Sequence, residues 1–235
     1  MVDLTGKKVA FLLTDGYEDS ELTSPWEAVE KAGAAAELVA PKVGEVEGKN
    51  GHKQSVDRTS GDADAGSYDA LVLPGGVVNA DHLRMDADSI AFTKAFFDAG
   101  KPVAVICHGG WILTDADVLR GRTLTSYPSL KTDLANAGAT WVDQEVVVDH
   151  GLVSSRTPDD LPAFNAKLVE EIAEGRHEGQ KACTPGPVVD WGPCPASLGP
   201  TCPTPCAPRS RRSSARRSSA TPRTPAASRR APPTA

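Results

Sequence analysis

Short apolar runs alternate along the first 175 residues with longer stretches whose apolar positions recur every three or four residues. The short runs are rich in Val and Leu, which is typical of strands buried on both faces of a sheet. These predicted strands are Val9–Leu13, Ala36–Val39, Ala70–Leu73, Val103–Ile106, Thr123–Ser126 and Val146–Val148. The stretches with helical spacing are Ser20–Ala32, Asp88–Ala99, Trp111–Leu119, Ser129–Ala137 and Leu161–Glu174. The alternation predicts an α/β sandwich with a mostly parallel sheet.

Glycines and one short turn sequence set the boundaries of these elements. Gly33, Gly100, Gly121 and Gly138 stand where helix C-terminal caps belong. In "VVVDHGLVSS" the turn residues at 149–151 separate two apolar runs, and this spacing is typical of a β-hairpin. We therefore expect one antiparallel element in the otherwise parallel sheet.

Composition divides the chain into two segments. Residues 1–175 contain 15 Lys and Arg against 29 Asp and Glu, whereas residues 176–235 contain 10 against 2. Twelve of the nineteen prolines and four of the five cysteines lie beyond Arg176. Such a segment has too little apolar material to offset the entropy lost on ordering. We predict one domain over residues 1–175 and a low-complexity, disordered C-terminal tail over residues 176–235.

The predicted tail contains two sequence features with possible chemistry. "CPTPC", together with Cys183 and Cys194, has neighbouring prolines and irregular spacing, which argue against a metal site. The Arg and Ser runs are suited at most to nucleic-acid binding through phosphate contacts that do not depend on sequence. Low-complexity sequence of this kind also arises when a GC-rich reading frame shifts. We therefore assign the tail no function.

The N-terminus reaches its first apolar run, "KKVAFLL", almost directly, without a leader and cleavage site. No run of about 18 apolar residues is present that would cross a membrane. We expect a cytoplasmic protein that has no membrane partner.

Three loops that follow predicted strands are the candidates for a functional site. They are "TDGYED" after the first strand, "PGG" at residues 74–76 and "CHGG" at residues 107–110. Ligands of open α/β sheets bind in the crevice at the carboxyl ends of the strands. If these strands are neighbours, all three loops open onto one crevice.

Cys107 stands at a strand-to-helix turn, the arrangement that presents the nucleophile in nucleophile-elbow enzymes. A helix N-terminus favours the thiolate and brings the thiol pKa below its free value of about 8.5. The amide of His108, with that of Gly75 or Gly76, is placed to form an oxyanion hole. A cysteine that ends a buried strand is also common as a small core residue. The adjacent histidine and glycines, with Glu18 in the first loop, favour the chemical interpretation.

Five blocks of sequence resemble the ThiJ/PfpI family, specifically the bacterial PfpI branch of the class I glutamine amidotransferase-like proteins. They are "DGYEDSELTSP", "LVLPGGVVNADHLRMD", "GKPVAVICHGGWIL", "LTSYPSLKTDLANAGATWVD" and "VVVDHGLVSSRTPDDLPAF". The resemblance extends from about Lys7 to Glu174. It implies a flavodoxin-like three-layer sandwich that forms a homodimer or a higher homo-oligomer.

The resemblance also implies roles for individual residues. Cys107 resembles the nucleophile, Glu18 the carboxyl that hydrogen-bonds the thiol, and His108 the acid/base that also contributes to the oxyanion site. Gly75 resembles the second oxyanion donor. Asp81 occupies the slot in which peptidase members carry a glutamate donated by a neighbouring subunit. The further residues assigned to oxyanion or substrate binding are Gly76, Gly109, Trp111 and Tyr127.

Three functions agree with these residues. We expect a glyoxalase-III-like or deglycase-like enzyme for reactive aldehydes or their early adducts, in which Cys107 forms a hemithioacetal while His108 and Glu18 move protons. This chemistry needs neither a cofactor nor a metal. The alternatives are an intracellular cysteine peptidase acting on peptides and a non-enzymatic stress sensor whose thiol is oxidised to a sulfinate. Glutamine amidotransfer is not expected, because no histidine and glutamate stand two residues apart late in the domain.

Overall fold

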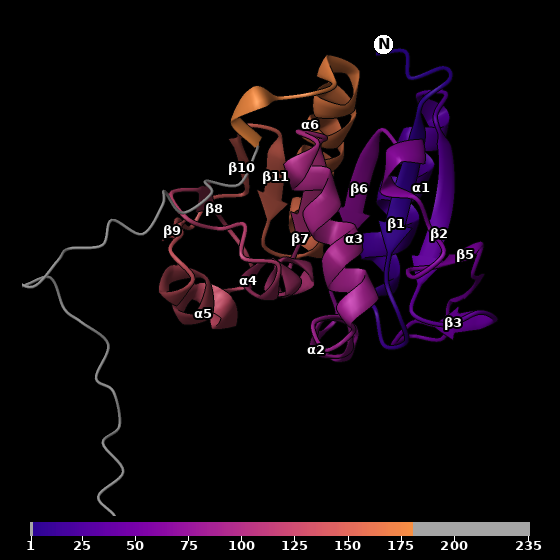
Figure 1. Cartoon of the computed structure of the whole chain (residues 1–235), viewed down its shortest axis with the longest axis horizontal. Coiled ribbons are helices and arrows are strands. Elements are labelled where there is room, and N and C mark those ends of the chain that lie inside the picture. Colours follow the sequence, from indigo (N-terminus) through magenta and orange to yellow (C-terminus); the bar gives the residue numbers. More distant parts are fainter. Residues whose placement is uncertain (1, 181–235) are drawn as a thin grey trace, which may run out of the picture. The chain divides into compact units, whose positions relative to one another are not determined.

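The computed structural model describes residues 2–180 and contains one seven-stranded sheet. The strands of this sheet are β1 (Lys8–Leu12), β2 (Ala35–Ala40), β5 (Arg58–Thr59), β6 (Ala70–Leu73), β7 (Val103–Ile106), β10 (Val146–Asp149) and β11 (Leu152–Ser155). Their order is β10-β11-β7-β6-β1-β2-β5, which Figure 1 shows from left to right. All neighbours are parallel except β10 and β11. The mostly parallel sheet with one antiparallel element is confirmed.

Helices cover both faces of this sheet. They are α1 (Asp19–Lys31), α2 (Val77–Leu83), α3 (Ala87–Asp98), α4 (Ile112–Asp115), α5 (Lys131–Asn136) and α6 (Leu161–Glu174). Successive residues of β1 belong to two separate apolar cores, because side chains alternate between the faces of a strand. Ala10 and Leu12 lie in the core that contains α3 and α4. Val9 and Phe11 lie in the core that contains α1 and α6, so the fold is the flavodoxin-like three-layer sandwich expected.

The predicted hairpin at residues 149–151 joins β10 to β11. Asp149 pairs with Leu152, and the two residues between them have positive φ values of 49° at His150 and 84° at Gly151. Positive φ at both central residues defines the type I′ turn, whose twist matches that of the flanking strands.

Two small sheets lie outside the main one. The predicted strand Thr123–Ser126 is shorter than expected and does not join the seven-stranded sheet, because β8 (Thr123–Leu124) pairs with β9 (Thr140–Trp141). β3 (Glu45–Glu47) and β4 (Lys53–Ser55) form an antiparallel pair that the apolar pattern did not predict. Their short, mostly polar sequences lack the apolar alternation of a buried strand.

The predicted helix Trp111–Leu119 is wrong in extent. The chain instead forms a 3₁₀ turn at Gly109–Trp111 and then the four-residue helix α4. Asp117 adopts a left-handed conformation with a φ of 52°, which a right-handed helix does not accommodate. The element that follows Cys107 is therefore much shorter than the helix expected there.

The folded chain continues beyond residue 175. His177 donates its backbone N–H to the carbonyl of Gly100 at 2.7 Å, and Gln180 is fully buried. The guanidinium of Arg122 donates to both the backbone and the side-chain oxygen of Gln180. Residues 176–180, which we assigned to the tail, thus pack on the domain. Residues 181–235, including the predicted disorder, the four further cysteines and the basic runs, lie outside the described residues.

No helix between residues 2 and 180 combines the length and apolar character needed to cross a bilayer.

Candidate active site

Cys107 directly follows β7 and begins the sharp turn into the next element. Its φ of 58° is unusual for a residue with a side chain, and such strained positions cluster at functional sites. Two backbone hydrogen bonds hold it, one from its N–H to the carbonyl of Ser155 at 3.0 Å and one to its carbonyl from Tyr127 at 3.1 Å. A β-carbon at Gly109 would lie 2.1 Å from the backbone oxygen of Leu73. Only glycine therefore allows the turn to approach β6 this closely.

The carboxyl beside the thiol belongs to Glu21, not to Glu18. Glu21 is fully buried, and its Oε2 accepts the backbone N–H of Gly75 at 2.8 Å. Its side chain also interacts directly with the Cys107 thiol. The other carboxyl oxygen, Oε1, is buried and has no hydrogen-bond partner among the described residues. The carboxyl of Glu21 therefore has unused capacity to hold a proton.

Glu18 lies at the N-cap of α1, one turn before Glu21. Its carboxyl forms an ion pair with Lys49, which lies in the turn between β3 and β4. The helix turns Glu21 toward the sheet, together with Pro25 and Val29, which follow at intervals of four residues. An acidic residue on this buried stripe is the sequence signal that identifies Glu21.

Burial shifts the ionisation of both members of the Cys107–Glu21 pair. It raises the pKa of Glu21 to about 7, and burial followed by the negative charge of Glu21 raises the pKa of Cys107 to about 12. The expected lowering of the thiol pKa is therefore wrong, because burial and the charge of Glu21 outweigh any lowering. Only a 3₁₀ turn and a four-residue helix follow the thiol. The thiolate is favoured only when the proton stays on Glu21.

His108 lies against the thiol on its other side. Its Nδ1 lies 3.2 Å from Cys107 Sγ, and its Nε2 lies 3.1 Å from the hydroxyl of Ser129. The ring stacks on Tyr127, with 4.6 Å between the ring centroids. Burial lowers the pKa of His108, so the imidazole is neutral at pH 7 and able to accept a proton. No motif in the sequence singled out Ser129.

The backbone N–H groups around the thiol differ in availability. The N–H of Gly75 is already bonded to Glu21 and is not available to an oxyanion. The N–H groups of His108 and Gly76 instead interact with the sulfur of Cys107 and favour its anion. Gly76 has a φ of 94°, a conformation that glycine adopts without strain. The two N–H groups that interact with the sulfur are therefore those of His108 and Gly76.

A cavity of about 410 Å³ opens onto these groups. Its lining residues are Gly16, Glu18, Glu21, Lys49, Gly76, Val77, Val78, Cys107, His108, Tyr127 and Pro158. The volume is that of a small-molecule site with a few polar groups in an apolar wall. Another cavity of similar volume, about 420 Å³, surrounds Lys101 but has no thiol in its lining.

Two residues assigned from the sequence lie elsewhere in this chain. Trp111 does not line the cavity. It donates its indole N–H to Asp133, and the guanidinium of Arg84 stacks over its ring. Asp81 is exposed on α2 and does not line the cavity.

The fold and the site define a flavodoxin-like α/β protein with a cysteine on a strand-to-helix elbow. The chain belongs to the DJ-1/PfpI family, which it matches over residues 7–171. This confirms the family expected from the sequence.

Two relatives are similar along almost their whole length. YraA of Bacillus subtilis (strain 168), whose name marks a candidate cysteine protease, is 49% identical over 160 residues, covering 68% of this chain and 94% of YraA. Protein/nucleic acid deglycase 2 of Escherichia coli (strain K12) is 48% identical over 166 residues, covering 69% and 96% of the two chains. These names indicate hydrolase-type enzymes in the family.

Solved structures agree with the fold. Drosophila melanogaster DJ-1beta has a TM-score of 0.67 at 27% identity and covers 71% of this chain and 90% of its own. A two-domain protein of Anabaena variabilis, with DJ-1/ThiJ/PfpI-like and ferritin-like domains, has a TM-score of 0.69 at 33% identity. The match covers 71% of this chain and 48% of that protein.

Proposed function

We propose that this protein is a cofactor-independent, cysteine-dependent enzyme of the cytoplasm that acts on reactive aldehydes or their early adducts on amines and thiols. The observation that carries the proposal is a partly buried thiol beside a buried carboxyl whose pKa is raised to about 7, both in the lining of a 410 Å³ cavity. A carboxyl with this pKa both accepts and donates protons near neutral pH. The similarity to a protein named as a deglycase supports the same chemistry.

The reaction begins with the transfer of the Cys107 proton to Glu21. The thiolate adds to the aldehyde carbon, and the N–H groups of Gly76 and His108 stabilise the oxyanion that forms. Protonation of this oxygen gives a hemithioacetal. With a 2-oxoaldehyde, neutral His108 removes the hydrogen of the former aldehyde carbon as a proton, which gives an enediolate, and returns it to the adjacent carbon. The hydroxyl of the hemithioacetal loses its proton as it becomes the thioester carbonyl, and the adjacent carbonyl oxygen gains a proton as it becomes the new hydroxyl. Water then hydrolyses the resulting thioester to a 2-hydroxy acid and regenerates the thiol.

A peptidase is the weaker candidate, although the name of one relative suggests it. Peptidase triads use a third group to orient the histidine. In the part of the chain described, His108 Nε2 meets the Ser129 hydroxyl and not a carboxylate. The 410 Å³ cavity also suits a small molecule better than an extended chain.

We further propose a homodimer in which Asp81 lies near the partner's site. In support, Val77 and Val78 on α2 are 56% and 51% exposed, and both line the cavity. Exposed apolar residues beside a site are common at subunit contacts. Light scattering that gives the mass of one chain at micromolar concentration would contradict this proposal.

The test compares four proteins with methylglyoxal and, separately, with casein: wild type, Cys107→Ser, Glu21→Gln and Glu18→Gln. We expect loss of turnover in Cys107→Ser and a fall of about 10²-fold or more in Glu21→Gln, the scale for removal of a positioned acid/base. Glu18→Gln, one helical turn before Glu21, is the matched control and should lose much less. Equal losses in the two glutamine variants, or cleavage of casein without turnover of methylglyoxal, would overturn the assignment.

A further inference from the structure

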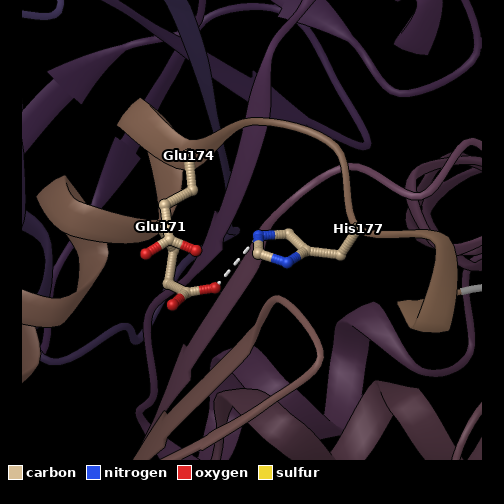
Figure 2. A group of neighbouring side chains, drawn as sticks. All are labelled: Glu171, Glu174 and His177. Carbon is tan, nitrogen blue, oxygen red and sulfur yellow. Dashed lines mark ion pairs between the residues drawn. The ribbon is translucent and has the colours of Figure 1, made fainter.

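A second group of ionisable side chains gathers at the end of α6. Glu171 and Glu174 lie three residues apart, on one side of the last helical turn. His177 follows Gly175, where the chain leaves the helix and turns back toward it (Figure 2). One possible ligand atom from each of the three residues lies within 4.8 Å of the other two.

Two of these atoms are buried with their bonding capacity unused. The Glu171 side chain is only 7% exposed, and its Oε2 lies 3.1 Å from Nε2 of His177. The pair is close enough to attract, yet neither atom has a hydrogen-bond partner among the described residues. A buried carboxylate without such a bond is costly unless a positive charge compensates it.

The surroundings hold the imidazole in place. The backbone N–H of His177 is bonded to the carbonyl of Gly100 at 2.7 Å. A β-carbon on Gly151 would lie 2.6 Å from His177 Cδ2, so the ring occupies space that only glycine leaves open. Gln180, bonded to Arg122, anchors the other end of the segment. The histidine is therefore positioned by its own backbone and by two glycines.

We propose that Glu171, Glu174 and His177 bind a divalent transition-metal ion of the Zn²⁺ type. Zinc accepts imidazole nitrogen and carboxylate oxygen at about 2.0–2.2 Å in a tetrahedral arrangement, which separates neighbouring ligand atoms by about 3.3 Å. The 3.1 Å between the atoms of Glu171 and His177 matches one edge of that tetrahedron. Glu174, which is exposed and free to rotate, supplies the third ligand, and water the fourth.

The bound ion connects the segment after α6 to the helix through its ligands. It takes no part in the chemistry of Cys107. Gly100, which holds His177, precedes β7, whereas Cys107 follows the same strand. The two sites thus lie at opposite ends of β7. The proposal therefore stands independently of the proposed enzymatic function.

The test uses the full-length chain without an affinity tag, stripped with EDTA and titrated with Zn²⁺ while the Tm is recorded. For the wild type we expect Tm to rise by about 5–10 °C when free Zn²⁺ exceeds Kd a hundredfold. The rise should disappear in Glu171→Gln and in His177→Ala, and it should be reduced in Glu174→Gln. The matched controls Glu170→Gln and His150→Ala change an exposed neighbour and an exposed histidine outside the cluster, and they should keep the full response.

Substitution by Co²⁺ distinguishes this site from thiolate sites elsewhere in the chain, because a thiolate ligand gives an intense charge-transfer band. The Co²⁺ that the wild type binds and His177→Ala does not bind should therefore show no such band. If Glu171→Gln does not fold, the test rests on His177→Ala, because this change alters a half-buried side chain outside the helix. A Zn²⁺ response that is equal in wild type and His177→Ala, or absent up to millimolar Zn²⁺, overturns the proposal.

Discussion

Cys107 and Glu21 act as one ionisable unit, because each changes the proton affinity of the other. With Glu21 titrating near pH 7 and the thiol near pH 12, the pair holds a single proton across most of the neutral and alkaline range. That proton resides on either the carboxyl or the sulfur. Hydrogen bonds from Gly76 and His108 to the sulfur reduce the cost of moving it from the sulfur to the carboxyl. The reactive anion is thus formed without release of a second proton.

The alkylation rate of Cys107 by iodoacetamide should reveal this shared proton. In the wild type we expect the rate to rise as pH passes through about 7, where the pair loses its first proton. In Glu21→Gln the rise should move to higher pH, because burial still disfavours the anion and no carboxyl remains to hold its proton. Peptide-mapped labelling against pH measures this. A profile that Glu21→Gln leaves unchanged would mean that the two groups are not coupled.

The turn between β7 and α4 depends on a close contact with its neighbouring strand. Gly109 packs against the backbone at the end of β6, where a β-carbon would lie 2.1 Å from an oxygen. At Gly110 the same atom would lie 3.4 Å from the side chain of Val105, an ordinary contact. Adjacent glycines of one motif therefore differ in their tolerance of a side chain.

Gly109→Ala should lower the free energy of unfolding by about 3 kcal/mol, because backbone must move to accept the methyl group. For a chain of this size the loss corresponds to a fall in Tm of about 6–12 °C. The matched control Gly110→Ala should stay within about 2 °C of the wild type. Differential scanning calorimetry of the two variants measures this. Equal values of Tm would show that the turn moves away from β6 easily.

The folded unit includes six residues beyond the end of α6. Gln180 provides two oxygen acceptors for the buried guanidinium of Arg122, and its side-chain amide donates to the carbonyl of Lys101 at 3.3 Å. Loss of the hydrogen bonds of a buried charge costs about 1.5–3 kcal/mol for each bond. The boundary of the domain is therefore set by polar contacts that follow the last apolar helix.

Two shortened chains test this boundary in the presence of EDTA, which removes any contribution of a metal. A chain that ends at Gly175 should lose at least about 4 °C in Tm, because the two acceptors that Gln180 offers to Arg122 and the packing of His177 are removed. A chain that ends at Gln180 should keep the Tm of the full-length protein. Identical thermal unfolding of the two shortened chains would place the boundary at Gly175, as the apolar pattern alone suggests.

The sequence alone determined the layers of the fold and the position of the thiol. Buried parallel strands require short apolar runs, and each run at β1, β2, β6 and β7 stands out between helical stretches. The same logic places Cys107 at the carboxyl end of β7, where sites of open α/β sheets lie. The hairpin at residues 149–151 was equally evident, because only a few residue types accept positive φ.

Only the tertiary structure decided which groups surround that thiol. Glu18 and Glu21 belong to one loop-to-helix segment. Packing against the sheet turns Glu21 inward, whereas Glu18 forms an ion pair with Lys49. Glu21 likewise decides which backbone N–H is available beside the thiol, because its carboxyl already accepts the N–H of Gly75 and leaves that of Gly76. Ser129 reaches His108 from 21 residues further along the chain. Local patterns report burial and turns, but the partner of a polar atom is set by chain segments that meet only when the whole domain packs.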